Sequence, residues 1–137
     1  MTAGIVVLGS LNMDLVARVP VLPRPGETVM GDRLQTFCGG KGANQAVAAA
    51  RLGGRVTMIG RVGRDGHGDT LVRRLERERV DAGGVRRDAG APTGAALITV
   101  AADGENAIGR YTAAGSPLLA DPRGGNSNRS GMMPTTV

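Results

Sequence analysis

Aromatic residues are nearly absent from this chain of 137 residues, which contains one Phe, one Tyr and no Trp. A hydrophobic core must therefore consist of aliphatic side chains, and nucleobases would find almost no aromatic ring on which to stack. Histidine, cysteine and lysine occur once each, at His67, Cys38 and Lys41. A single cysteine excludes an intramolecular disulfide framework and a zinc site built from several cysteines. We therefore expect a reducing, cytoplasmic location.

Long apolar runs are missing too, because no stretch approaches the ~18 apolar residues of a membrane span. Residues 1–8 lack the basic segment and the length of a signal peptide. We thus expect no membrane partner. The formal net charge of +5 favours nucleic-acid binding, but the arginines are scattered from Arg18 to Arg129 without one long block. A basic nucleic-acid binder is therefore the lesser alternative.

The chain does contain enough aliphatic sequence for one domain, since 41% of its residues are hydrophobic. Short apolar runs at residues 4–10 and 55–62 predict buried strands, and helical patterns cover residues 43–52 and 69–80. His67 falls in the glycine-rich turn before the second helix, so we expect it in a loop. The alternation of strand and helix predicts an α/β fold with a parallel sheet flanked by helices.

A second set of strands is predicted outside that sheet. Residues 15–19 and 27–37 have β character and are joined by a connection rich in Pro and Gly, which indicates a small antiparallel excursion. Residues 93–101 form another predicted strand, and residues 103–104 carry a hairpin turn signal before a partner strand at residues 105–108. No strand is predicted between the second helix and residue 93.

The glycine-rich stretch at residues 37–46 is the strongest candidate for a binding site. Glycine lets the backbone approach a ligand closely, and this stretch opens into a helix whose first N–H groups are available to a ligand. Lys41 adds a positive charge, and Asn44 adds a side chain that can both donate and accept hydrogen bonds. The combination suits a small ligand that is rich in hydroxyl groups or anionic.

Known phosphate-binding motifs do not explain the glycines. A Walker A loop needs Ser or Thr after its lysine, where this chain has Gly42, and Gln45 takes the place of the third glycine of a dinucleotide fingerprint. Asn12 and Asp14 follow the first predicted strand, where ligands bind in α/β sheets, although an Asx turn explains them equally well. The residues alone predict a site for a polar small molecule near Asn12, Asp14 and residues 39–44, and they identify no reaction.

Several segments taken together resemble the ribokinase branch of the PfkB family of carbohydrate kinases. They occur in the family's order and spacing over about the first 108 residues. Linked motifs of this kind are far more specific than one glycine loop. The matching segments are residues 7–14, 23–28, 39–53, 59–65, 93–98 and 104–106.

The resemblance implies ATP-dependent phosphorylation of D-ribose to ribose 5-phosphate, aided by Mg²⁺ and in many members by a monovalent cation. By the same resemblance the antiparallel strands form a β lid, which closes over the sugar and often serves as a homodimer interface. Within the family, Lys41 and residues 44–46 favour ribose over fructose or adenosine. The residues implied to bind the sugar hydroxyls or line the pocket are Asn12, Asp14, Gly40, Lys41, Gly42 and Asn44, with Ala96 and Ile98 against the apolar side of the sugar.

Two departures from the family pattern bear on activity. The family places its ATP site and catalytic aspartate in a C-terminal Gly-Ala-Gly-Asp motif, which does not occur in this sequence. We therefore predict no catalytic, ATP-binding or metal-binding residue in the chain. The family's lid strand also continues with apolar residues, whereas Arg110 interrupts that pattern here.

These departures predict two regions. Residues 1–108 form a ribokinase-like sugar-binding part that includes the lid strands, and residues 109–137 form an irregular tail, frameshifted or disordered, on a truncated kinase that lacks its catalytic half. Two alternatives remain: a non-catalytic remnant that binds sugar or dimerises, and another PfkB-type sugar or nucleoside kinase.

Overall fold

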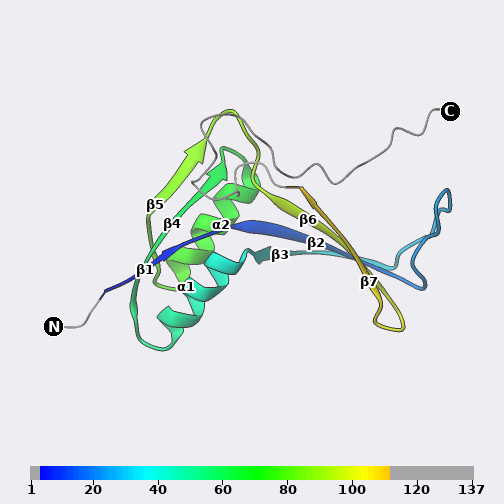
Figure 1. The fold of residues 1–137 in the computed structure, drawn as a ribbon, viewed down its shortest axis with the longest axis horizontal. Helices are drawn as coiled ribbons and strands as arrows, with labels where there is room; N and C mark the ends of the chain where they lie inside the picture. Colours follow the sequence, from blue (N-terminus) through cyan, green and yellow to red (C-terminus); the bar gives the residue numbers. More distant parts are fainter. Residues whose placement is uncertain (1–3, 112–137) are drawn as a thin grey trace.

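Two β-sheets divide residues 4–111, which are the part of the chain that the computed structural model describes (Figure 1). Sheet A contains three strands in the order β1-β4-β5, and sheet B contains four in the order β3-β2-β6-β7. Two helices, α1 and α2, lie between strands in the sequence. The elements are β1 (Gly4–Leu8), β2 (Asn12–Val19), β3 (Arg33–Gly39), α1 (Lys41–Arg51), β4 (Arg55–Gly63), α2 (Gly66–Arg77), β5 (Asp81–Asp88), β6 (Ala95–Ala101) and β7 (Asn106–Tyr111).

Sheet A is parallel throughout, and its core lies on one face. In the β1–β4 register, Val7 is opposite Met58, and both side chains pack toward the helices because alternate residues of a strand point to the same face. Buried residues of both helices join this cluster, for example Ala46 of α1 and Leu71 of α2. The structure therefore confirms the predicted α/β fold, with both described helices on the same face of the sheet.

The opposite face of sheet A is exposed along β1. Val6 and Leu8 retain 64% and 61% of their surface, although parallel sheets usually have both faces covered. Ile59, the register partner of Leu8 on β4, belongs to the same face.

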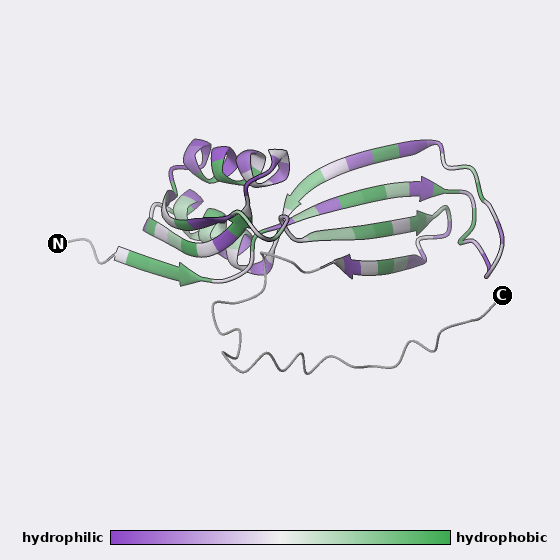
Figure 2. Cartoon of the chain, turned by 90° about the horizontal axis from the view of Figure 1, so that it is seen from above, coloured by the Kyte–Doolittle hydropathy of each residue, from purple (hydrophilic) through white to green (hydrophobic). Residues whose placement is uncertain are grey.

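Sheet B confirms the predicted excursion and the predicted hairpin. Strand β2 pairs with β3 antiparallel and with β6 parallel, and β6 pairs with β7 antiparallel. Figure 2 shows these strands extending away from the helices as a separate twisted sheet. The connection between β2 and β3 is rich in Pro and Gly, and no strand is assigned there, so β3 begins at Arg33 rather than at residue 27.

Several boundaries differ from the predictions. Helix α2 begins at Gly66 because the side chain of Asp65 accepts a hydrogen bond from the Gly68 amide, so His67 lies in the first turn of a helix and the loop prediction was wrong. Helix α1 begins at Lys41, two residues before the predicted start. Strand β5 was not predicted at all, because its first residues, 81–84, have the composition of a turn.

The departure from the family's apolar pattern at Arg110 does not end the strand. Arg110 is a strand residue of β7 and lies opposite Ala96 of β6. Backbone pairing with β6 supports the strand, and an exposed arginine side chain does not disturb it. The proposed tail from residue 109 otherwise falls on residues 112–137, which lie outside the described residues, so the division at residue 108 remains a prediction.

Candidate functional site

Strand β2 holds the first two predicted site residues side by side. Asn12 and Asp14 are strand residues, which excludes the Asx turn, and they share one face of sheet B. The Asn12 Nδ2 donates to Asp14 Oδ1 at 2.7 Å and makes a longer contact of 3.3 Å with the Met13 carbonyl. Asn12 is buried and Asp14 half-buried, while Met13 points the other way into the core. The carboxylate of Asp14 is thus fixed by a charge-assisted hydrogen bond.

The two glycines at the end of β3 bring the backbone against this pair. Gly39 lies opposite Asn12, and a Cβ atom on Gly39 would come within 2.3 Å of Asp14 Oδ2. At Gly40 a Cβ atom would lie 2.4 Å from the Ser10 carbonyl oxygen, and the φ angle of 99° is one that other residues rarely adopt. Both positions therefore require glycine for the chain to pass from β3 into α1.

Helix α1 then starts beside Asp14 with its first turn open. Its N-cap residue, Gly40, provides no side-chain acceptor, and Ala43 N donates to the Ser10 carbonyl at 3.1 Å. Within residues 4–111 the amides of Lys41 and Gly42 have no hydrogen-bond acceptor. These amides, the helix dipole and the exposed Lys41 side chain make the helix start favourable for electron-rich ligand atoms.

A residue that the sequence did not indicate supports this loop from α2. Arg74 Nη1 donates to the Cys38 carbonyl at 2.6 Å and lies 3.4 Å from Asn44 Oδ1, which is at the outer limit of a hydrogen bond. In the sequence, Arg74 is one of several charged residues within the helical pattern of residues 69–80. Its contact joins residues 36 positions apart, so helical periodicity could not reveal it.

Strand β6 adds an apolar wall to the same face of sheet B. Ala96 is the register partner of Asp14, and Ile98 is the partner of Val16, the next residue of β2 on that face. Phe37 of β3 lies on the other side of Asp14 and is 48% exposed. The polar pair is therefore bordered by apolar side chains, which suits a ligand with a polar edge and an apolar side.

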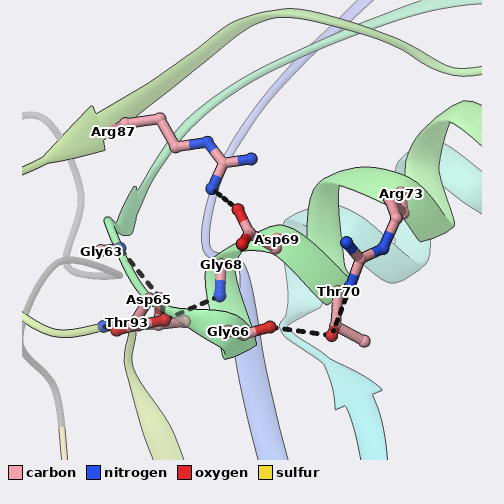
Figure 3. A network of polar contacts seen from close by, with 9 residues as sticks. All are labelled: Gly63, Asp65, Gly66, Gly68, Asp69, Thr70, Arg73, Arg87 and Thr93. Carbon is pink, nitrogen blue, oxygen red and sulfur yellow. Dashed lines mark hydrogen bonds and ion pairs between the residues drawn. The ribbon is translucent and has the colours of Figure 1, made fainter.

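A second polar cluster joins α2 to β6 and was not predicted (Figure 3). Asp65 Oδ1 accepts from the Gly68 amide at 2.8 Å and from the Thr93 hydroxyl at 2.7 Å, and Asp65 Oδ2 accepts from the Thr93 amide at 2.7 Å. Burial raises the pKa of Asp65, but these hydrogen bonds and the nearby His67 together bring the pKa below its usual value. Asp65 therefore remains ionised in this cluster at neutral pH.

Other features of the described chain lie away from this site. Within residues 4–111 no group of three or more His, Cys, Asp or Glu side chains could hold a metal ion. A hollow at the far end of sheet B is lined by Arg18 and Val100, which form one register pair of β2 and β6. This pair lies two positions beyond Val16 along β2, so the hollow is separate from Asp14. Neither helix of the described part is long and apolar enough to cross a membrane.

The described residues form an α/β unit in which a polar pair, a glycine loop and a helix start meet beside a projecting sheet. The chain belongs to the PfkB family of carbohydrate kinases, since the model described as pfkB family carbohydrate kinase matches residues 2–123.

Individual relatives agree with this assignment. The chain is 45% identical over 112 residues to the ribokinase of Haemophilus influenzae, covering 82% of this chain and 37% of that protein. It is 49% identical over 109 residues to the ribokinase of Bacillus subtilis, covering 76% of this chain and 35% of that protein. The structure of Arabidopsis thaliana ribokinase complexed with ribose and ATP aligns with a TM-score of 0.76 at 37% identity, covering 83% of this chain and 37% of that one. The chain thus spans little more than a third of each of these relatives.

Proposed function

We propose that this chain is the sugar-binding part of a ribokinase-type carbohydrate kinase, and that its sugar is D-ribose. The observation that carries the proposal is the Asn12–Asp14 pair, which lies against Gly39 and Gly40 at the start of α1. The likeness to the Arabidopsis ribokinase, whose structure holds ribose and ATP, supports the choice of sugar.

Each predicted site residue has a distinct role in this proposal. Asp14 accepts hydrogen bonds from sugar hydroxyls, and Asn12 orients its carboxylate through the 2.7 Å bond. The open amides of Lys41 and Gly42 donate to sugar oxygens, and Gly40 permits their approach. The remaining contacts are polar ones from the Lys41 and Asn44 side chains and apolar ones from Ala96 and Ile98.

ATP, Mg²⁺ and a monovalent cation are the cofactors that the family implies. When bound, ATP supplies the phosphoryl group and Mg²⁺ neutralises its charge. The described residues do not fit Mg²⁺, because residues 4–111 gather no cluster of three potential metal ligands, and the Gly-Ala-Gly-Asp motif that the family uses for ATP does not occur in the sequence. We therefore assign no catalytic, ATP-binding or metal-binding residue to this chain, and we expect no turnover of ribose from the chain alone.

A chimera tests the proposed activity. Residues 4–108 would replace the matching part of the Bacillus subtilis ribokinase, which retains the rest of its own chain. We expect ADP formation that depends on ribose. A chimera active on fructose or adenosine but not on ribose would instead support the alternative of another PfkB-type sugar or nucleoside kinase. A soluble, folded chimera that is inactive on all three substrates would contradict the kinase assignment.

We further propose that sheet B acts as a lid and as a homodimer interface, and that the protein acts in the cytoplasm. The support for dimerisation is the exposure of large apolar side chains on this sheet, with Leu34 70% and Leu97 61% exposed. These residues lie on the face opposite to Asp14, since the register pairs Ala17 with Leu34 and Leu15 with Leu97. Light scattering after size exclusion should detect a dimer that a Leu97→Lys substitution converts to monomer.

A further inference from the structure

Sheet B joins the rest of the described molecule at three places that are close to the candidate site. Strand β2 leaves the loop after β1, β3 returns through Gly39 and Gly40, and β6 starts just after Thr93 and Gly94. The first two crossings touch each other, because Gly40 packs on the backbone of Leu11 and Asn12. The third is tied to the first by the Met13 amide, which donates to the Gly94 carbonyl at 2.9 Å.

At the second crossing Arg74 of α2 donates to the Cys38 carbonyl, whereas the third crossing carries a network of several side-chain hydrogen bonds to sheet A and the start of α2. The Asp65 carboxylate accepts hydrogen bonds from the Thr93 amide and from the Thr93 hydroxyl. The Thr93 hydroxyl in turn accepts a hydrogen bond from the Gly63 amide at 2.9 Å. Thr93 is 3% exposed, so water competes little for these bonds. Figure 3 shows Asp65 between the end of β4, the start of α2 and Thr93.

The packing around this network leaves little freedom. A Cβ atom on Gly63 would lie 2.5 Å from the Thr93 amide nitrogen and 2.6 Å from Asp65 Oδ2. A Cβ atom on Gly68 would lie 2.4 Å from the Gly63 carbonyl oxygen and 3.0 Å from the Thr93 hydroxyl. The two glycines thus allow three backbone segments to converge on one carboxylate, which goes beyond what an ordinary helix cap requires.

We propose that Asp65 is a positioning residue for the sugar site, because it anchors Thr93 and thereby fixes the orientation of β6 and β2 relative to sheet A. The anchor acts on the site through two short connections. Ala96 follows Thr93 by three residues on β6, and the Met13–Gly94 hydrogen bond holds β2 between Asn12 and Asp14. That this orientation serves sugar binding rests on the proposed function, whereas the anchoring itself does not.

The chemistry of Asp65 allows the anchor to be separated from the helix cap. An Asp65→Asn side chain keeps one carbonyl oxygen for the Gly68 amide, and Asn caps helices about as well as Asp. Its NH₂ group cannot accept from the Thr93 amide, so that bond is lost, and of the two bonds from Thr93 only the weaker, uncharged one from its hydroxyl to the remaining carbonyl oxygen is left. Thr70→Val is the matched control, because it removes the 2.8 Å bond from the Thr70 hydroxyl to Gly66 at the same helix start without touching sheet B.

Amide hydrogen exchange of the full chain without sugar tests the proposal. In Asp65→Asn we expect protection of Met13, Thr93 and the β6 amides to fall at least about tenfold, with much smaller changes in β4 and in α2 beyond its first turn. Thr70→Val should leave the protection of β6 unchanged. Unchanged β6 protection in Asp65→Asn would overturn the proposal, and so would a uniform loss across β4, α2 and β6, which indicates general destabilisation.

A second pair of variants decides the matter if Asp65→Asn does not fold. Thr93→Ser retains the hydroxyl, so the β6 amides should stay protected from exchange. The isosteric Thr93→Val variant lacks the hydroxyl, so protection of the β6 amides should fall. Equal protection of β6 in these two variants would count against the anchor. Titration of the wild-type chain with D-ribose tests the proposed function independently. Absence of binding would contradict the proposed function, but it would not change what hydrogen exchange shows about the anchoring of Thr93 by Asp65.

Discussion

Gly40 combines two constraints that a substitution can separate. Its φ angle is 99°, and a Cβ atom there would meet the Ser10 carbonyl oxygen at 2.4 Å. Gly104, in the turn between β6 and β7, has a φ of 92° but no atom within 4 Å of an added Cβ. We expect Gly104→Ala to cost about 1–2 kcal/mol from its backbone conformation alone. Gly40→Ala should cost about 1–3 kcal/mol more because of the overlap.

Urea unfolding followed by circular dichroism measures both variants against the wild-type chain. Equal losses of unfolding free energy in the two variants would mean that the loop beside Asp14 can move away from the new methyl group. The close approach of α1 to β2 would then not be a fixed feature of the site.

Asp14 is the side chain on which sugar affinity should depend most. Replacing its carboxylate by an amide in Asp14→Asn removes a charge-assisted acceptor, so the dissociation constant for D-ribose should rise at least about tenfold in the chimeric kinase. Asp32→Asn makes the same change of charge in the connection before β3, away from the site, and should leave the affinity unchanged. Calorimetric titration of both variants with D-ribose measures the effect. If Asp14→Asn bound D-ribose as tightly as Asp32→Asn, Asp14 would not belong to the proposed sugar site.

The sequence revealed the parts of the site that are close along the chain or belong to a specific motif. Asn12, Asp14 and the residues at 40–44 could be predicted, and the fold does bring them together. Arg74 and Thr93 could not, because they act on residues 36 and 28 positions away through contacts that only the folded chain creates. Neither local propensity nor helical periodicity contains that information.

At the level of elements, the link between α2 and β6 should make stability depend on pH. The pKa of Asp65 is lower in the folded chain than its usual value of about 3.9, so the ionised form stabilises the fold. This contribution is fully present above about pH 5 and is lost as the pH falls through the folded-state pKa. The difference in unfolding free energy between wild type and Asp65→Asn should therefore be largest near neutral pH, about 1–2 kcal/mol, and should shrink below about pH 4.

Urea unfolding at a series of pH values measures this difference. Asp69→Asn is a useful control, since Asp69 pairs with Arg87 at an exposed position and should contribute little at any pH. A difference between wild type and Asp65→Asn that is constant with pH would show that ionisation of Asp65 does not stabilise the link.

Strands and helices were predictable where a residue pattern repeats along the sequence. They were less predictable where a single tertiary contact determines whether the element forms or where it begins. The β1, β4 and α1 regions followed from apolar runs and alanine-rich helical spacing. Strand β5 was missed because Gly83 and Gly84 indicate a turn, yet the segment pairs with β4 at the edge of sheet A. The start of α2 was misplaced because Asp65 converts the flexible sequence of residues 66–68 into a helical turn.

At the scale of the whole molecule, the exposed face of sheet A should cause further association beyond the dimer proposed for sheet B. Val6 and Leu8 share that face, and an apolar surface on a parallel sheet favours contact with another surface. The double substitution Val6→Thr and Leu8→Thr keeps β propensity, so we expect weaker binding of a hydrophobic dye and less association in analytical ultracentrifugation, with little change in stability. Leu52→Thr is the control, because Leu52 is 89% exposed but stands alone after α1. If the control reduced association as much as the double variant, association would follow total apolar exposure, and the continuous face of β1 would have no special part in it.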